Sequence, residues 1–302
     1  MNVHADAPPR ELTVVPRCAL HAVPSTLLIP LAARAWGDER YPWLACGDQD
    51  ARRLLACLEP GARAWLDDAW VVLNVLWRTR VLKEVAGRFF AAHPHAAGVN
   101  LGCGLSNPFQ WLDTGRNTWV DADLPEVMSL RHTLLPARPP RWRGVAVDLR
   151  TPGWWRRLGL PAGRAARRPR KTPAEPVFLL CEGVLMYLRP PQVRAVLQEF
   201  AAQAPPGSQF LADFISCLGV GHARWVPSLA HSRAQFHWGA GGWSDFTDAH
   251  PRLRLLERHS AAEIRGLWLR LMEAGCEPLL GPALYGMALL GVADALLTGD
   301  AT

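Results

Sequence analysis

Short apolar runs alternate with helical segments through the last two thirds of the chain, and this alternation limits the possible folds more than any other feature. The runs predicted as strands lie at 99–101, 118–120, 144–147, 177–180, 209–211, 253–256 and 285–292. The segments predicted as helices lie between them, at 109–112, 125–135, 154–158, 191–202 and 261–274. Alternating β and α units at this spacing build a doubly wound sheet of mostly parallel strands. We therefore predict an α/β fold with a seven-stranded, Rossmann-like sheet.

The segments around this alternation predict the domain organisation. Residues 1–24 are polar and interrupted by prolines, which indicates a flexible N-terminus. Residues 25–92 carry apolar side chains at three- and four-residue steps, which predicts an N-terminal helical cap. The main domain is then 93–302. Two insertions are expected within it: a basic one at 159–175, and one rich in Trp, His and Gly at 217–251, after the fifth strand.

The formal net charge of +6 raises the question of a nucleic-acid partner. Five of the 33 basic residues lie in one run, 164–171, which has no acidic residue and is bounded and broken by proline and glycine. An RNA-binding surface would instead need basic residues interleaved with aromatic ones over the folded surface. We expect no nucleic-acid partner, and a basic RNA-binding protein stays as the alternative from another functional class.

Seven cysteines stand singly, with no Cys-x-x-Cys pair and no spacing typical of a zinc site. This usage predicts reduced thiols in a cytoplasmic protein and no bound metal. No uncharged apolar run reaches the ~20 residues that cross a bilayer, and the N-terminus lacks a signal-peptide pattern. We therefore expect no membrane partner, and no feature of the sequence predicts an oligomeric state.

Four of the predicted strands end in residues suited to a nucleotide-like ligand. The first ends in a Gly-x-Gly turn at 100–104, where the backbone can bend sharply and a ligand can approach it closely. The second ends at 121–123 (Asp-Ala-Asp), the third at 148–149 (Asp-Leu), and the fourth at 181–183, which contains Glu182. Ligands bind at the carboxyl ends of the strands in such sheets, so these residues are expected to face one crevice.

The chemistry of this set favours S-adenosylmethionine over a dinucleotide. An acid after the second strand can accept hydrogen bonds from both ribose hydroxyls, and an acid after the third can accept one from the adenine amine. Glu182 can pair with an ammonium group. A nicotinamide-dependent dehydrogenase would need a third glycine in the first turn and a crevice suited to pyrophosphate, and this chain has neither.

The motifs that follow one another along the chain are similar to those of a known family. They lie at 26–35, 77–80, 100–104, 119–127, 147–149, 180–188 and 235–239. In this order they resemble the leucine carboxyl methyltransferase family, and most of all its bacterial polyketide-type O-methyltransferase branch. The resemblance extends over about residues 25–292. It implies a class I methyltransferase fold and transfer of a methyl group to a hydroxyl or carboxyl oxygen of a small, polyketide-like molecule; methylation of a protein C-terminus is the alternative within the family.

The resemblance also implies roles for individual residues. Arg78 would bind the methionine carboxylate of the cofactor, with Arg80 as the alternative, and Glu182 would hold the methionine end. The remaining cofactor-binding positions lie on the glycine turn and after the next two strands: Asn100, Gly102, Gly104, Asp121, Asp123, Asp148 and Leu149. Asp123 would hold the ribose, and Asp148 with Leu149 the adenine.

The catalytic group on the acceptor side depends on which oxygen is methylated. A carboxylate acceptor needs no general base, whereas a phenol or an alcohol does. The candidate bases are His222, His231, His237 and Tyr187. His237 is favoured among the histidines because Phe236 and Trp238 flank it in the variable insertion, and Tyr187 because it follows the fourth-strand motif.

Overall fold

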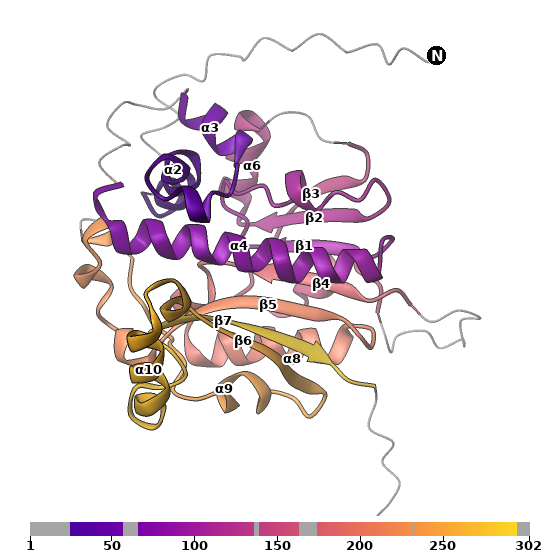
Figure 1. Ribbon diagram of the computed structural model, residues 1–302. Helices are drawn as coiled ribbons and strands as arrows, with labels where there is room; N and C mark the ends of the chain where they lie inside the picture. Colours follow the sequence, from indigo (N-terminus) through magenta and orange to yellow (C-terminus); the bar gives the residue numbers. More distant parts are fainter. Residues whose placement is uncertain are drawn as a thin grey trace, which may run out of the picture.

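A computed structural model of the chain describes residues 25–56, 66–135, 139–162, 174–230, 232 and 234–294. The predicted N-terminal segment 1–24 and the basic run 164–171 lie outside the described residues. The described part holds one seven-stranded sheet in the order β3-β2-β1-β4-β5-β7-β6. Strand β7 is antiparallel to both of its neighbours, and the other neighbouring pairs are parallel. This arrangement confirms the predicted α/β fold (Figure 1).

The strands begin and end close to the positions that the apolar runs predicted. Their bounds are β1 Ala97–Leu101, β2 Thr118–Asp123, β3 Trp142–Ala146, β4 Val177–Cys181, β5 Gln209–Ile215, β6 Leu253–Ser260 and β7 Tyr285–Val292. All five residues of the central strand β4 are buried. A strand covered on both faces needs a continuous apolar run, which is why Val-Phe-Leu-Leu-Cys gave so clear a signal.

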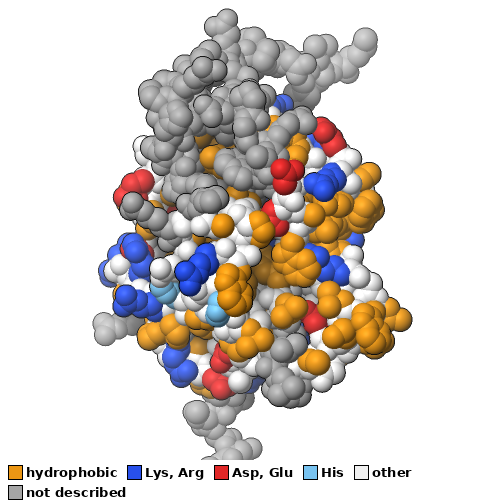
Figure 2. Space-filling model, turned by 90° about the vertical axis from the view of Figure 1, so that its left-hand side faces the viewer, with side chains coloured by type: hydrophobic (Ala, Val, Ile, Leu, Met, Phe, Trp, Pro, Cys, Tyr) orange, Lys and Arg blue, Asp and Glu red, His pale blue; other side chains and the backbone are white. Residues whose placement is uncertain are grey.

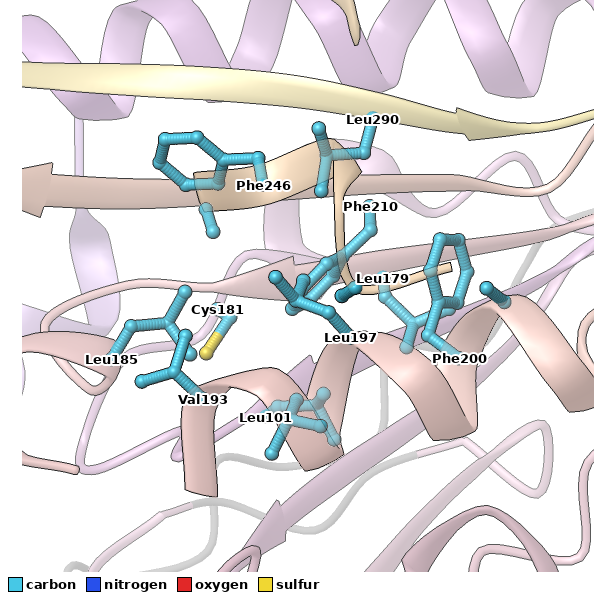
Figure 3. Packing of buried hydrophobic residues seen from close by; sticks show 14 of the residues in the cluster. Leu101, Leu179, Cys181, Leu185, Val193, Leu197, Phe200, Phe210, Phe246 and Leu290 are labelled. Atoms are coloured by element: carbon cyan, nitrogen blue, oxygen red, sulfur yellow. The ribbon is translucent and has the colours of Figure 1, made fainter. Parts of the chain in front are cut away.

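The two faces of the sheet are covered by different helices. On one face, helix α4 (Ala69–Ala92) packs its Val81, Val85 and Phe89 against Phe178 and Leu180 of β4. On the other face, α8 (Pro190–Gln203) packs against the alternate residues of the same strand (Figure 3). Successive strand side chains point to opposite faces, so one strand serves both cores.

Most of the other helices of the described chain connect the strands or build the insertion after β5. The connecting elements are α5 Phe109–Leu112, α6 Pro125–Leu134, α7 Trp154–Arg157, η3 Leu185–Tyr187, η7 Ala261–Ile264 and α10 Leu267–Leu280, whereas η1 Pro42–Leu44 precedes the first strand. The insertion holds the short helices η4 Cys217–Gly219, η5 Ala223–Trp225, η6 Pro227–Leu229 and α9 Ser244–Thr247. The prediction of one helix at 261–274 is wrong, because this segment forms two helices, η7 and α10. The chain breaks at Gly266, whose φ of 103° ends η7 and precedes α10.

Two further helices near the N-terminus, α2 (Ser25–Arg40) and α3 (Gln49–Ala56), pack on each other beside the glycine turn. Leu31, Leu54 and Leu55 share a core there with Leu105. Helix α4 links this group to the sheet: its first half packs on α2, and its second half packs on the sheet. The parallel strands end on the side where α2 lies, and Figure 2 looks onto that side, where hydrophobic side chains surround a hollow.

Candidate active site

A cavity of about 850 Å³ lies at the carboxyl ends of the parallel strands. Its wall is built by the loops after β1, β2, β3 and β4, by α2 and α4, and by the insertion after β5. Sites for small molecules usually have volumes of roughly 300–1,000 Å³. The volume of this cavity lies in the upper part of that range.

The loop after β1 forms the tight turn that the glycine spacing predicted. Gly102 and Gly104 both have left-handed backbone conformations, with φ of 64° and 49°. A Cβ on Gly102 would lie 2.2 Å from Cγ2 of Val184, so a side chain has no room there. The Gly102 and Cys103 N–H groups donate to the carbonyl oxygen of Ala122, which ties the turn to β2. Both glycines line the cavity.

Asp123 ends β2 and faces the same turn. Its Oδ2 accepts a hydrogen bond of 2.8 Å from the Gly104 N–H, and its Oδ1 accepts one of 2.7 Å from the Leu124 N–H. Burial raises the pKa of this carboxyl above its ordinary value, although the two N–H donors act in the opposite direction. Each oxygen keeps a second lone pair, so the carboxylate can still accept hydrogen bonds from a ligand.

Asp148 and Leu149 follow β3 and also line the cavity. Arg150 binds the Asp148 carboxylate, with Nη2 at 2.7 Å from Oδ2, and this contact lowers the pKa of Asp148. The pair lies near the surface: a third of the Asp148 side chain and half of that of Arg150 are exposed. The acid therefore stays ionised while one edge of it faces the cavity.

A buried cluster of charges forms where α4 meets β4, β5 and β7. Arg78 Nη1 donates to Oδ2 of Asp213 and to the hydroxyl of Tyr285, each at 2.9 Å. Tyr285 donates in turn to Asp213 at 2.6 Å. The Gly183 N–H donates to the other oxygen of Asp213 at 2.7 Å. Burial opposes the charge of Arg78, but these neighbours together with Glu182 raise its pKa above the ordinary value.

Arg78 and Glu182 form a buried ion pair in this cluster: Glu182 Oε1 lies 3.3 Å from Arg78 Nε, and the two atoms are not aligned for a hydrogen bond. Arg78 Nη2 also makes no hydrogen bond to any residue that the structure describes. An arginine and a carboxylate that line the same cavity suit a zwitterionic ligand, which carries both a carboxylate and an ammonium group.

Asp213 was not predicted from the sequence, although its carboxylate forms an ion pair with Arg78. Its side chain is fully buried and does not line the cavity. A signal was present, because Asp213 is the one acid inside the apolar run Gln209–Ile215 of β5. A charged residue in a buried strand requires a partner, and Arg78 supplies it.

Two predicted cofactor residues lie elsewhere. Asp121 does not line the cavity: its carboxylate is fully buried, forms an ion pair with Arg131, and accepts from the indole N–H groups of Trp119 and Trp142. Adjacent strand residues point to opposite faces, so Asp121 shares the face of Asp123 but lies two residues deeper in the strand. This corrects the prediction for Asp121. Arg80 is half-exposed, pairs with Glu84 on the outer face of α4 and does not line the cavity.

Asn100 does line the cavity, and its Nδ2 donates to Ser106 Oγ at 3.3 Å. The other predicted positions on the loops after the strands line it as well: Arg78, Gly102, Gly104, Asp123, Asp148, Leu149 and Glu182. The structure thus brings together, from five separate segments, nearly the whole set that the sequence predicted.

The candidate bases are also separated by the structure. Tyr187 and His222 line the cavity, whereas His237 is exposed and does not line it. His231 lies outside the described residues. Burial raises the pKa of Tyr187 to about 12, so its hydroxyl stays protonated at neutral pH. The preference for His237 is therefore not supported by its position, and its neighbour Phe236 is the residue that reaches the cavity.

The part of the wall away from the charged cluster is largely apolar. It is formed by α2, the start of α4, η3 and the insertion, and includes Ile29, Val71, Met186, Trp225 and Phe236. No group of three His, Cys, Asp or Glu side chains suited to a metal ion occurs in the described residues. Within the same residues, no helix combines the length and hydropathy that a membrane span requires.

Comparison with known proteins identifies the family of this fold and site. The profile of the leucine carboxyl methyltransferase family matches residues 30–201. That match covers the glycine turn, the three loops that follow it and Arg78. The chain belongs to the leucine carboxyl methyltransferase family. It is therefore a methyltransferase, as the resemblance implied.

Two individual relatives of this methyltransferase are informative. The tetracenomycin polyketide synthesis O-methyltransferase TcmP of Streptomyces glaucescens is 30% identical over 242 residues, which are 80% of this chain and 84% of TcmP. A solved structure assigned as a methyltransferase from Thermobifida fusca is 18% identical, with a TM-score of 0.55, over 92% of this chain and 98% of that one. The second likeness concerns the fold alone.

Proposed function

We propose that this methyltransferase transfers the methyl group of S-adenosylmethionine to an oxygen atom of a small, flat, largely apolar molecule such as a polyketide. One observation carries the proposal: the glycine turn, the acids after β2, β3 and β4, and the open side of Arg78 all line one cavity. Family membership and the 30% identity to an O-methyltransferase of polyketide synthesis support it.

The residues present fit this cofactor from end to end. The Nη2 group of Arg78, which makes no hydrogen bond to a described residue, and the carboxylate of Glu182 suit a carboxylate and an ammonium group, which the methionine end of the cofactor carries on one carbon atom. Asp123 would accept from the ribose hydroxyls. Asp148 would accept from the adenine amine, which Leu149 would cover. When bound, the cofactor supplies an electrophilic methyl group, and the protein orients and shields it.

The apolar part of the wall supports a flat acceptor. Several large side chains line the cavity and are also exposed at its mouth, namely Trp70, Leu218, Trp225 and Leu284. Exposed apolar side chains that gather at the rim of a cavity are typical of binding sites for apolar ligands. We place the reaction in the cytoplasm, which the five free cysteines of the described residues support.

The test is transfer of a labelled methyl group to an unknown acceptor. Small-molecule extracts of the host are incubated with the enzyme and with S-adenosylmethionine carrying a deuterated methyl group, and the products are read by mass spectrometry. We expect labelled small molecules, which form more slowly with Glu182→Gln at the same limiting cofactor concentration. Label found only on protein C-termini, or only on RNA, would overturn the proposed acceptor class in favour of one of the two alternatives.

A further inference from the structure

Asn74 is a buried amide of the cavity wall to which the cofactor assignment gives no role. It lies on α4, one helical turn before Arg78, and both side chains line the cavity. Only 7% of Asn74 is exposed. Val71, which precedes it on the same helix, packs against the apolar cluster that holds Met186 and Phe236. Asn74 therefore lies where the charged cluster meets the apolar part of the wall.

The orientation of the Asn74 amide is set by Arg265. Arg265 Nη2 donates to Oδ1 of Asn74 at 3.1 Å. A guanidinium has no acceptor, so the amide atom that faces it must be the oxygen, and Nδ2 must lie on the other side. Nδ2 makes no hydrogen bond to any residue that the structure describes, and these residues do not enclose it. It therefore faces the open space of the cavity with two hydrogen atoms to donate.

Arg265 is itself held in place by Trp70. Its Cζ lies 3.1 Å from the centroid of the Trp70 ring, and its Nη2 lies 3.5 Å from the Trp70 carbonyl oxygen. Arg265 follows η7 and does not line the cavity, whereas Trp70 and Asn74 do. The arginine thus fixes two side chains of the wall without reaching the cavity itself. A stacked and hydrogen-bonded guanidinium has a defined position, and it passes this order on to the amide.

We propose that Asn74 binds the acceptor: its Nδ2 donates a hydrogen bond to a carboxylate or carbonyl oxygen of that molecule, and Arg265 is the positioning residue that holds the amide in this orientation. Arg78 and Glu182 already match the methionine end of the cofactor, which leaves the Asn74 donor for the acceptor. The inference rests on the proposed function and deepens it. A buried donor that is left unpaired disfavours a molecule without the oxygen, so Asn74 selects acceptors.

The experiment compares two probes that share a ring and differ in one group, 2-naphthoic acid and 2-methylnaphthalene. The affinity for S-adenosylhomocysteine is measured first, by calorimetry. Binding of each probe to the enzyme saturated with S-adenosylhomocysteine is then measured by equilibrium dialysis, which needs no turnover. The variants are Asn74→Leu, Arg265→Met and Arg265→Lys. Gln203→Leu is the matched control, because Gln203 is an exposed amide at the end of α8, outside the cavity wall.

We expect Asn74→Leu to weaken binding of 2-naphthoic acid by roughly 10- to 100-fold, the usual range for a hydrogen bond to a charged group. Binding of 2-methylnaphthalene should not weaken, because this probe has no oxygen to accept from Asn74. The affinity for S-adenosylhomocysteine should equal that of the wild type, which also shows that the variant is folded. Gln203→Leu should match the wild type in all three measurements.

The two substitutions of Arg265 test its positioning role. Arg265→Met should weaken binding of 2-naphthoic acid by about 2- to 10-fold, because the Asn74 amide is then free to rotate. Arg265→Lys should retain most of the affinity, since lysine also donates without accepting. An affinity of Arg265→Met equal to that of the wild type would overturn this role.

Equal affinities of Asn74→Leu and the wild type for 2-naphthoic acid, including no binding by either, would overturn the proposal for Asn74. So would an equal loss for both probes, or a loss of affinity for S-adenosylhomocysteine in Asn74→Leu, because Asn74 would then serve packing or the cofactor. Failure of the wild type to bind S-adenosylhomocysteine would instead overturn the proposed function.

Discussion

Burial affects the charge of individual residues at this site in different ways. Arg78 keeps its charge in a buried position because Asp213 and Tyr285 bind it on one side, which leaves its other side free for a ligand. Removing either partner of such a cluster strands a buried charge, at a cost of about 3–5 kcal/mol. Substitutions that test binding are therefore better made at positions whose loss does not unfold the protein.

Asp123 offers such a test through pH. Burial raises its pKa above the ordinary 3.8, so on acidification it becomes protonated earlier than an exposed aspartate would. The protonated form is a poorer acceptor for ribose hydroxyls. We expect the affinity for S-adenosylhomocysteine, measured by calorimetry from pH 7 downward, to fall as this group is protonated. In Asp123→Asn the affinity should be lower at pH 7 and this part of the pH dependence should disappear; a wild-type affinity that does not fall on acidification would contradict the assignment.

The sequence could predict that Asp123, Asp148 and Glu182 line one cavity, because polar residues after buried parallel strands lie at the same edge of the sheet. It could not separate Asp121 from Asp123, which differ by two positions and share a face of β2. The structure separates them through Arg131 of α6. Its guanidinium forms a buried ion pair with Asp121, whereas Asp123 lines the cavity. Likewise, Arg78 and Arg80 are distinguished by the rotation of α4 about its axis, which depends on the packing of the whole helix.

At the scale of elements, one capping residue connects helix α4 to the insertion that closes the acceptor side. Asp68 is the N-cap of α4: its Oδ1 accepts from the Val71 N–H at 3.2 Å, and its Oδ2 accepts from the Ser228 N–H at 3.1 Å. One carboxylate thus stabilises the start of a helix and fixes a loop 160 residues away in the sequence.

Substitution of this cap should destabilise the protein. Asp68→Ala removes both hydrogen bonds, and loss of an N-cap typically costs about 0.5–2 kcal/mol in the free energy of unfolding, with the lost bond to Ser228 in addition. Urea denaturation measures the change. The exposed neighbour Asp67, substituted in the same way, is the control and should be close to neutral. An equal effect of the two substitutions would show that the cap is not formed.

Two glycines in adjoining elements should respond to alanine with opposite signs. A Cβ on Gly98 in β1 would lie 2.3 Å from the ring of Trp119 and 2.9 Å from Phe90, so Gly98→Ala should cost about 1–3 kcal/mol. A Cβ on Gly87 in α4 would meet nothing within 4 Å, so Gly87→Ala should stabilise the helix by about 0.5–1 kcal/mol. Denaturation midpoints of the two variants test this; a destabilised Gly87→Ala would contradict the described packing of α4.

Strands and helices with a clear hydrophobic pattern could be predicted from the sequence, whereas the points where a helix is interrupted were harder to predict. The continuous apolar run of β4 and the helical spacing of α8 placed both elements within a residue or two. The break at Gly266 was missed because the apolar period runs on through 261–274, across the boundary between η7 and α10.

At the scale of the whole molecule, the sheet order determines where chemistry can occur. Strands β2, β1 and β4 are neighbours, so the loops that follow them meet at one edge. Helices α2 and α4 and the insertion then cover that edge and leave one cavity (Figure 1). The cofactor side follows from strand order and could be predicted. The acceptor side is built from loops and short helices whose sequence has no hydrophobic period. The sequence therefore could not show that His222, and not His237, lines the cavity.

The most direct test of the cofactor site is calorimetric titration of S-adenosylhomocysteine into the wild type, Glu182→Gln and Glu84→Gln. Glutamine keeps the shape of Glu182 but removes the charge that would bind the ammonium group. A charge-assisted hydrogen bond contributes about 1.5–3 kcal/mol, so Glu182→Gln should weaken binding by roughly 10- to 100-fold. Glu84 lies on the exposed face of α4, outside the cavity, and its variant should bind like the wild type. An affinity of Glu182→Gln equal to that of the wild type would contradict the account.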